Sequence, residues 1–476
     1  MPKLCLISLG CTKNLVDSEV MLGALSRYER TNEPQNADII IINTCGFIAS
    51  AKKESIDRIL EVAYLKKDDA ILIVSGCLSE RYAEELRDEI KEIDIITGVG
   101  DYDKIESMIK RVRDSRKMRN ESSLRGVENA EAIHKSKLDC HDLPQASLAM
   151  TQKTPQILKS DKTFLIDNEQ RIITGSAIHA YIKISEGCNQ QCSFCAIPHF
   201  KGKLHSRGID SIMREVDSLV ARGYADFSFI AQDSSSYMRD LGKKDGLVEL
   251  IKRVENSGAK SARILYLYPT TTSESLIHAI ADSRVFQNYF DMPLQHISDK
   301  MLRAMKRGAD KARHIALLEQ MRGCENSFVR TTFLLGHPQE SERDFAELCE
   351  FVSDFSFERA NIFGFSREEG TVAFDMSGEV SAKTTKERIK TLNAILSKQQ
   401  KNSLKSLVGK EIVAIIEGRS TQSDLLFSAR DLRWDREIDG EILINDSAIP
   451  LNSGYYKVQI TDFKGGILLG KAIAKI

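Results

Sequence analysis

Long apolar runs are missing from this sequence of 476 residues. No stretch approaches the roughly 20 consecutive apolar residues that a membrane-spanning helix needs. The opening residues, Met1 to Gly10, also lack the apolar core and small-residue cleavage site of a secretory signal peptide. We therefore expect a cytoplasmic protein with reduced thiols, and we interpret its first residues as a β-strand.

An excess of charge is missing as well. The sequence has 67 Lys and Arg against 68 Asp and Glu, which gives a formal net charge of −1. This balance creates no overall field that would attract nucleic acid, although it is compatible with a local basic patch. With 42% hydrophobic and 28% charged residues, the composition is that of an ordinary globular protein. The length predicts roughly three domains.

Ten cysteines are present. In a reducing compartment, clustered cysteines bind metal or do chemistry more often than they form disulfides. Four of them follow no pattern, and we interpret these as small buried apolar residues. They are Cys5, Cys140, Cys324 and Cys349. The other six fall into two groups of three.

The first group lies in the N-terminal third, where apolar runs alternate with helical patterns and predict a parallel, doubly wound sheet. The runs are residues 4–9, 38–42, 70–74 and 94–97. Cys11, Cys45 and Cys77 follow directly on the first three runs, 34 and 32 residues apart, which is about one βαβ unit. Because parallel strands end at one edge of a sheet, we expect the three thiols to meet there.

Three thiolates suit a [4Fe–4S] cluster with one iron left open. One alternative is that three cysteines follow three strands by chance. Another is zinc, but a structural zinc site normally has a fourth protein ligand, and no histidine stands in the three turns.

The second group, Cys188, Cys192 and Cys195, forms a C-x3-C-x2-C loop directly after a predicted strand. Three thiolates on one short loop can hold three irons of a cubane, which leaves the fourth iron free to chelate S-adenosylmethionine (SAM). Phe194 precedes the last cysteine and either covers such a cluster or belongs to the core. The alternative is a Cys3His zinc site completed by His199.

Six apolar runs separated by helical patterns predict an open (β/α)6 barrel around this loop. The runs are residues 179–187, 226–231, 262–267, 289–292, 328–335 and 360–365. Barrel active sites form at the carboxyl ends of the strands, where Gln232 is a candidate for binding SAM. Arg330 lies inside the fifth run and is a candidate partner of the SAM carboxylate, with a structural ion pair as the alternative.

Two connecting segments are predicted. Residues 116–178 lose the periodicity of their neighbours and are interpreted as a loose linker. Residues 376–408 contain a long connecting helix, and from residue 383 to 409 there are seven Lys or Arg against one acidic residue. We interpret this segment as a solvated helix face, and contact with nucleic acid is the alternative.

Residues 409–476 switch to short strands separated by Gly, Asn and Asp turns, which predicts a small five-stranded, OB-like barrel. The strands identified are 411–417, 441–444, 455–461 and 467–476. A barrel that binds RNA should carry a net positive charge, whereas the positive and negative charges of this barrel nearly cancel. If the chain acts on a basic protein, as the resemblance described below implies, we expect the acidic residues of this barrel to pair with basic residues of that substrate. These are Asp431, Asp435, Glu437 and Asp439.

Together these parts resemble the methylthiotransferase family of radical SAM enzymes. The order of that family is a three-cysteine domain (here 1–115), a radical SAM domain (179–375) and a C-terminal TRAM barrel (409–476). The resemblance is closest to the branch that modifies small-subunit ribosomal protein twelve. It rests on the segments Asn43-Thr-Cys-Gly-Phe-Ile48, Tyr181-Ile-Lys-Ile-Ser-Glu-Gly-Cys-Asn189, Cys192-Ser-Phe-Cys-Ala-Ile-Pro198, Leu265-Tyr-Leu-Tyr-Pro269 and Asp291-Met-Pro-Leu-Gln-His296.

The resemblance implies that C–H on the β-carbon of one aspartate becomes C–SCH3. It implies two [4Fe–4S] clusters, one cleaving SAM to a 5′-deoxyadenosyl radical and one carrying the sulfur. It also implies an electron donor such as flavodoxin or ferredoxin, and we expect a monomer. Two alternatives are a tRNA adenosine methylthiotransferase and a non-catalytic RNA-binding module that contains a cluster or zinc.

Overall fold

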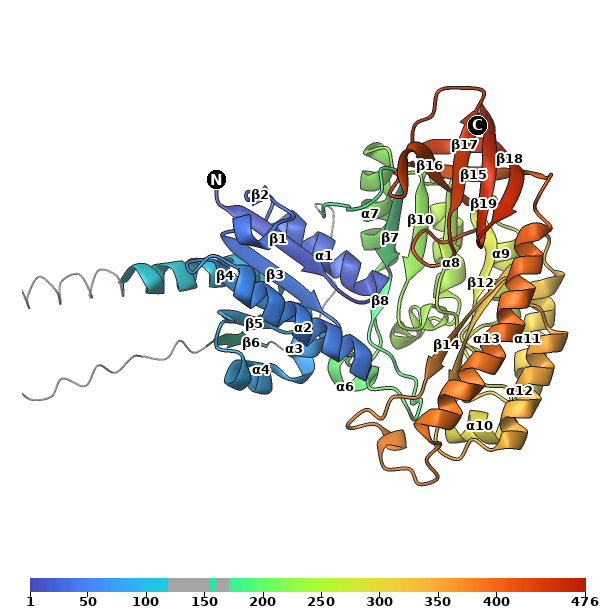
Figure 1. Cartoon of the computed structure of the whole chain (residues 1–476), viewed down its shortest axis with the longest axis horizontal. Coiled ribbons are helices and arrows are strands. Elements are labelled where there is room, and N and C mark those ends of the chain that lie inside the picture. Colours follow the sequence, from blue (N-terminus) through green and yellow to red (C-terminus); the bar gives the residue numbers. More distant parts are fainter. Residues whose placement is uncertain (119–154, 160–170) are drawn as a thin grey trace, which may run out of the picture. The chain divides into compact units, whose positions relative to one another are not determined.

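The computed structural model describes residues 1–118, 155–159 and 171–476. The chain divides into two compact units (Figure 1). The first comprises Met1–Phe164 with Gln170–Ile172, and the second comprises Leu165–Glu169 with Ile173–Ile476. None of the described helices is long and apolar enough to cross a membrane.

The first unit contains the predicted parallel sheet, in the strand order β2-β1-β3-β4-β5-β6. Every residue of β3 and β4 is buried, because helices cover both faces of a parallel sheet. The strands are β1 (Lys3–Ser8), β2 (Glu29–Arg30), β3 (Ile39–Thr44), β4 (Ile71–Gly76), β5 (Ile95–Thr97) and β6 (Gln156–Leu158). The helices are α1 (Thr12–Ala24), α2 (Ala49–Leu65), α3 (Cys77–Arg81) and α4 (Ala83–Glu89), with 3₁₀ turns η1 (Pro34–Asn36) and η2 (Tyr102–Lys104) before a helix at 105–118.

The edge strand β6 was not predicted. It pairs with β5 and lies inside residues 116–178, which were expected to form a loose linker. Three half-buried residues are too few to produce a periodic signal in the sequence. Most of that segment, including Cys140, lies outside the described residues.

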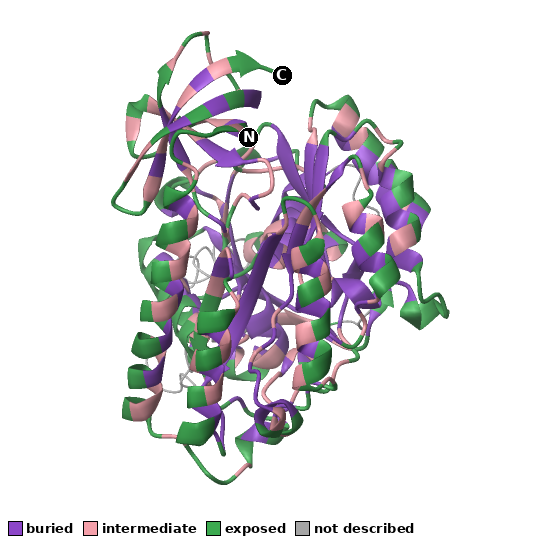
Figure 2. Ribbon diagram, turned by 90° about the vertical axis from the view of Figure 1, so that its right-hand side faces the viewer, coloured by how far each residue is buried: buried purple, intermediate pink, exposed green. Residues whose placement is uncertain are grey.

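The second unit begins with the partial barrel that six apolar runs predicted. Its parallel sheet has the order β14-β13-β12-β11-β10-β7, so each strand lies beside the next one along the chain. The strands are β7 (His179–Lys183), β10 (Asp226–Ile230), β11 (Ser261–Ile264), β12 (Phe286–Asp291), β13 (Phe328–Leu335) and β14 (Arg359–Gly364). Figure 2 shows the strands buried and the outer faces of the surrounding helices exposed.

The crossover helices of this barrel are α7 (Ile209–Ala221), α8 (Gly246–Val254), α9 (Glu274–Ala281), α10 (Asp299–Ala304), α11 (Lys311–Gly323) and α12 (Glu342–Asp354). Shorter elements are the ribbon of β8 (Ser185–Glu186) and β9 (His205–Ser206), helix α6 (Ile197–Lys201), and the 3₁₀ turns η3 (Ser234–Ser236), η4 (Arg239–Leu241) and η5 (Val372–Phe374). The long helix α13 (Ala382–Lys405) follows the last strand.

A closed barrel of five strands ends the chain, in the order β15-β16-β17-β19-β18, as predicted. The strands are β15 (Glu411–Ser420), β16 (Ser423–Asp431), β17 (Ile442–Ser447), β18 (Gly454–Lys464) and β19 (Ile467–Lys475). β16 was not identified from the sequence. Its residues show no alternation of buried and exposed positions, and only the last three are buried.

Buried charges join this barrel to the amino ends of the central strands. Asp226, the first residue of β10, pairs with Arg430 of the barrel (2.5 Å) and with Arg263 of β11 (2.8 Å). Asp435 accepts hydrogen bonds from Tyr181 (2.7 Å) and Ser228 (2.8 Å). The barrel is therefore fixed to the end of the sheet opposite the carboxyl ends of its strands.

The expectation that the acidic barrel residues face a substrate is wrong for three of the four. Asp431, Asp435 and Asp439 are 3%, 0% and 1% exposed. Asp431 pairs with Arg433 (2.8 Å), and Asp439 lies 3.6 Å from Arg330. Glu437 is exposed and pairs with its neighbour Arg436. A buried carboxylate needs a partner, and the partners of Asp435 and Asp439 come from distant strands that the local sequence does not reveal.

Replacing Asp226 by alanine would leave Arg263 and Arg430 buried without their carboxylate. We expect the free energy of unfolding to fall by about 3–5 kcal/mol, the usual cost of removing one partner of a buried ion pair. Urea denaturation followed by circular dichroism measures this loss. The control, Asp282→Ala, removes an exposed aspartate of the same unit and should change stability by less than about 0.5 kcal/mol. Equal losses in the two variants would contradict the role of the network.

The same variant should change how stability depends on pH. Burial raises the pKa of Asp226, but Arg263 and Arg430 outweigh burial and lower it well below its usual range. A carboxyl group with a depressed pKa stabilises the fold above its unfolded pKa of about 3.9 and loses that contribution as the pH falls. The difference between the wild type and Asp226→Ala should therefore shrink below about pH 4.

Candidate functional site

The three N-terminal cysteines lie in the turns after β1, β3 and β4. Cys11 is the N-cap of α1, Cys45 follows the last residue of β3, and Cys77 is the first residue of α3. The strands pair in parallel, with Ser8 opposite Asn43 and Asn43 opposite Ser75. The turns consequently meet at one edge of the sheet, as predicted.

Two glycines allow these turns to touch. A Cβ atom on Gly10, whose φ is +88°, would lie 2.7 Å from the Cβ of Cys45. A Cβ atom on Gly46 would lie 2.8 Å from the carbonyl oxygen of Cys77. Both distances are too short for real Cβ atoms, so each turn requires glycine to reach the next one.

Asn14 of α1 connects all three turns and was not recognised from the sequence. Its side-chain amide donates hydrogen bonds to the carbonyl oxygens of Leu9 (3.0 Å) and Thr44 (3.0 Å). Its Oδ1 accepts from the Cys77 thiol at 3.7 Å, and Asn43 donates to its backbone carbonyl (2.8 Å). A polar residue one helical turn after Cys11 was the only signal available in the sequence.

The Cys188–Cys195 loop is held at the carboxyl end of the central sheet. The amide of Cys188 donates to the carbonyl of Gly202 (3.1 Å), and the amide of Ser193 donates to that of Met305 (3.0 Å). Arg307, which was not predicted, donates from Nη1 to the Sγ of Cys192 (3.2 Å). Its guanidinium carbon lies 4.2 Å from the ring centroid of Tyr268, whose hydroxyl is 3.4 Å from the same sulfur.

The surroundings of the half-buried loop disfavour free thiolates. Burial raises the pKa of Cys188 and of Cys195 to about 12. Such thiols lose their protons only when a cation compensates the charge, which iron does on binding. Three soft sulfur donors beside one guanidinium therefore fit an iron–sulfur cluster.

The arrangement of donors suits a cluster better than a single ion. Within the ranges that the structure describes, no three His, Cys, Asp or Glu side chains could hold one metal ion together. A cubane does not need this convergence, because each thiolate binds a different iron. A tetrahedral zinc site does need it, which weighs against the Cys3His alternative with His199.

Phe194 and Arg330 lie at different ends of the central domain. Phe194 packs against Met301, Met305 and Leu334 and meets His337 edge to face at 6.4 Å. Arg330 lies near the amino end of β13, where it pairs with Asp291 (2.8 Å) and Asp439 (3.6 Å). The structure thus places Arg330 in an ion pair, whereas the half-buried Phe194, next to Cys195, remains a candidate for covering a cluster.

Gln232 lies just beyond β10, at the same end of the sheet as the cysteine loop. Its Nε2 donates to Glu186 (2.5 Å), which is also paired with Lys183 (2.8 Å) and Lys201 (3.3 Å). Its Oε1 is buried and has no hydrogen-bond partner among the described residues. Gln232 therefore offers an unused acceptor to a ligand.

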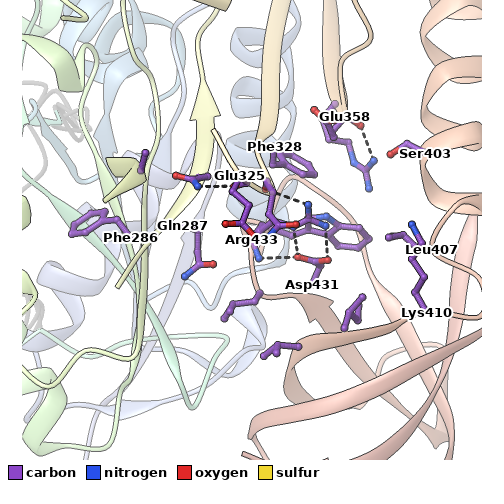
Figure 3. A pocket seen from close by; sticks show the side chains of 18 of the residues that line it. Phe286, Gln287, Glu325, Phe328, Glu358, Ser403, Leu407, Lys410, Asp431 and Arg433 are labelled. Carbon is purple, nitrogen blue, oxygen red and sulfur yellow. Dashed lines mark hydrogen bonds and ion pairs between the residues drawn. The ribbon is translucent and has the colours of Figure 1, made fainter. Parts of the chain in front are cut away.

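A hollow of about 980 Å³ lies at the amino end of the strands (Figure 3). Phe286, Phe328 and Arg359, the first residues of β12, β13 and β14, line it together with the end of α13 and the barrel. Arg433 and Asp431, which form an ion pair, also line this hollow. None of the candidate ligands lies there, so the hollow is separate from the cysteine site.

Two families match parts of the sequence. Residues 3–98 match the uncharacterized protein family UPF0004, and residues 182–352 match the radical SAM superfamily. Among solved structures, the radical SAM methyltransferase TsrM from Kitasatospora setae, with cobalamin and a [4Fe-4S] cluster bound, has a TM-score of 0.50. It is 14% identical, and the match covers 76% of this chain and 72% of that one, so the likeness concerns the fold.

Curated relatives match nearly the whole chain. The ribosomal protein uS12 methylthiotransferase RimO of Helicobacter hepaticus is 52% identical over 481 residues, which is 99% of this chain and 98% of that protein. The protein of the same name from Wolinella succinogenes is 52% identical, covering 98% and 97%. That of Helicobacter pylori is 51% identical, covering 99% and 98%.

We expect Asn14→Ala to loosen the N-terminal turns in the metal-free chain. The substitution leaves the carbonyls of Leu9 and Thr44 without a donor, which should lower the free energy of unfolding by about 1–3 kcal/mol. Cys77, 7% exposed, should then react faster with a thiol reagent. Thermal unfolding and timed alkylation with mass spectrometry measure the two effects. Asn36→Ala, at an exposed site in the same unit, is the control, and unchanged Cys77 reactivity in Asn14→Ala would contradict the assignment.

Proposed function

This chain belongs to the family of ribosomal protein uS12 methylthiotransferases, and we propose that it attaches a methylthio group to the β-carbon of an aspartate in uS12. It is a radical SAM transferase, as its central domain indicates. The observation that carries the proposal is the identity of more than half the residues along nearly the full length of both chains. The geometry adds two cysteine triads, each at the carboxyl edge of a parallel sheet.

The reaction explains why this chain needs metal cofactors. An unactivated C–H bond has no acidic proton and no leaving group, so acid–base side chains cannot cleave it. When bound, SAM and a reduced iron–sulfur cluster supply a radical that removes the hydrogen atom. The step consumes electrons, and we propose that a small one-electron donor such as flavodoxin or ferredoxin provides them.

We infer that Cys188, Cys192 and Cys195 hold the cluster that binds SAM. The backbone bonds to Gly202 and Met305 fix the loop. Arg307 places a positive charge against the sulfur of Cys192, which offsets the negative charge of the thiolates. The role of the protein here is to bind, to orient and to keep water out.

Gln232 and Glu186 are suited to orient SAM beside that loop. The free Oε1 of Gln232 can accept a hydrogen bond from an amino group. Glu186 is fixed by Lys183 and Lys201, and although burial opposes ionisation, these charges lower its pKa to about 2. Glu186 therefore remains a carboxylate at neutral pH and orients the amide of Gln232.

We infer a second [4Fe–4S] cluster on Cys11, Cys45 and Cys77, which carries the sulfur. Three cysteine ligands leave one iron without a protein ligand, as a sulfur carrier requires. Support comes from the close approach of the turns at Gly10 and Gly46 and from the hydrogen bonds of Asn14. Cys11 is exposed and Cys77 is buried, so one side of this triad is open to solvent.

The two triads should bind iron independently. Replacing Cys188, Cys192 and Cys195 by alanine should leave about half of the iron and sulfide and abolish reductive cleavage of SAM. Replacing Cys11, Cys45 and Cys77 should leave the other half and preserve that cleavage. Iron and sulfide analysis of anaerobically reconstituted protein, with deoxyadenosine quantified, tests both. A full iron complement in either variant would refute the ligand assignment, and Cys324→Ala with Cys349→Ala provides the control.

The substrate can be identified by mass spectrometry. Reconstituted enzyme, SAM and a reductant should convert one aspartate of uS12 into its methylthio derivative, and peptide fragmentation should locate the group on the side chain. Unmodified tRNA treated in parallel should remain unchanged. Methylthiolation of tRNA adenosine with uS12 left untouched would overturn the proposal.

A further inference from the structure

A row of lysines covers the outer face of α13 (Ala382–Lys405). At about 100° per residue, six of them fall within a sector of about 120° and extend over about 33 Å. They are Lys383, Lys386, Lys390, Lys398, Lys401 and Lys405, and all six are exposed. We call them the lysine stripe. Glu387 is the single acidic residue of the helix sequence.

The opposite face of α13 fixes the helix to the central domain. Leu392 and Leu396 are buried in the core of that domain. Arg388 pairs with Glu340 (3.2 Å) and Glu342 (3.0 Å). The stripe is therefore presented on a rigid support, and substitutions in it leave the packed face untouched.

The lysines of the stripe have no acidic partners among the described residues, in contrast to two basic residues of α2. On α2, Lys53 pairs with Asp57 and Arg58 pairs with Glu61. None of the six stripe lysines forms an ion pair with any residue that the structure describes. An ordinary solvated helix face mixes both signs of charge in similar numbers, whereas this one presents six lysines against one acidic residue, Glu387, which lies in the same sector.

We propose that the lysine stripe is a docking surface for the phosphate backbone of an RNA duplex. Lysine is depleted at protein–protein interfaces, which are built around apolar and aromatic residues, and the stripe contains no large apolar side chain. Duplex DNA carries one charge per about 1.7 Å of axis with both strands counted, so a duplex of about 33 Å carries roughly 20 phosphates, of which the stripe can contact those on one side. Contacts of this kind fix position without reading sequence.

The position of α13 links this surface to the catalytic end of the domain. Arg388, near the start of α13, pairs with Glu340, which lies just beyond the carboxyl end of β13. A Cβ atom on Gly336, the residue after β13, would meet the side chain of Thr385 in α13. The stripe therefore starts beside the carboxyl ends of the strands. This inference rests on the proposed function, because the protein substrate then belongs to an RNA-rich particle.

The test compares two full-length double variants with the same change in charge. Lys390→Glu with Lys401→Glu reverses two charges of the stripe, whereas Lys244→Glu with Lys252→Glu reverses two exposed lysines elsewhere on the central domain. Binding to a fluorescent RNA duplex of about 20 base pairs is measured between 50 and 200 mM salt, conditions that resolve phosphate contacts. We expect the stripe variant to bind about 10-fold or more weakly, with a salt slope lower by about two.

The control variant should change affinity less than about twofold, and both variants should still bind isolated uS12 and cleave SAM. If stripe and control variants bound the duplex alike, the proposal would be overturned. It would also be overturned if polyglutamate of equal charge competed as well as RNA, because the surface would then fit an acidic protein. Since the duplex assay contains no uS12, its result stands apart from the methylthiolation assay that tests the proposed function.

Discussion

Parallel pairing of strands is the constraint on which the chemistry of this chain depends. A parallel pair needs a crossover, and the crossover returns each strand in the same direction, so every strand ends at the same edge. In the N-terminal unit this brings together turns that are more than 30 residues apart in sequence, at Cys11, Cys45 and Cys77. In the central domain it gathers the Cys188–Cys195 loop, Gln232 and Tyr268 at one end. The opposite end is left free for the C-terminal barrel.

That opposite end is held by charge rather than by apolar packing alone. Asp226 lies between Arg263 and Arg430, and Asp435 is fixed by Tyr181 and Ser228. Buried ion pairs of this kind gain little over apolar packing, but each partner is costly to leave alone. They therefore specify one docking geometry of the barrel on the central sheet.

The sequence predicted those features that a periodic pattern or a fixed spacing encodes. The buried runs of β3 and β4 are continuous apolar segments, and the cysteines stand at fixed distances from strand ends. Short or irregular elements such as β6 and β16 carry no such period and were missed. Asn14 and Arg307 were missed because their partners lie far away in the chain. The expectation for Asp435 and Asp439 was wrong for the same reason. The sequence alone does not distinguish a buried, paired carboxylate from a solvated one when its partner lies far away in the chain.

The buried ion pairs between the barrel and the amino end of the central sheet limit which barrels could replace the native one. Arg430 of the barrel neutralises Asp226, and Arg330 of the sheet faces Asp439 of the barrel, so each side supplies charges that the other side requires. A barrel taken from another enzyme would leave these charged groups buried without partners unless it carried the same side chains at the same places. The C-terminal barrel is therefore not an interchangeable module, because the central sheet and the barrel each complete the buried ion pairs of the other.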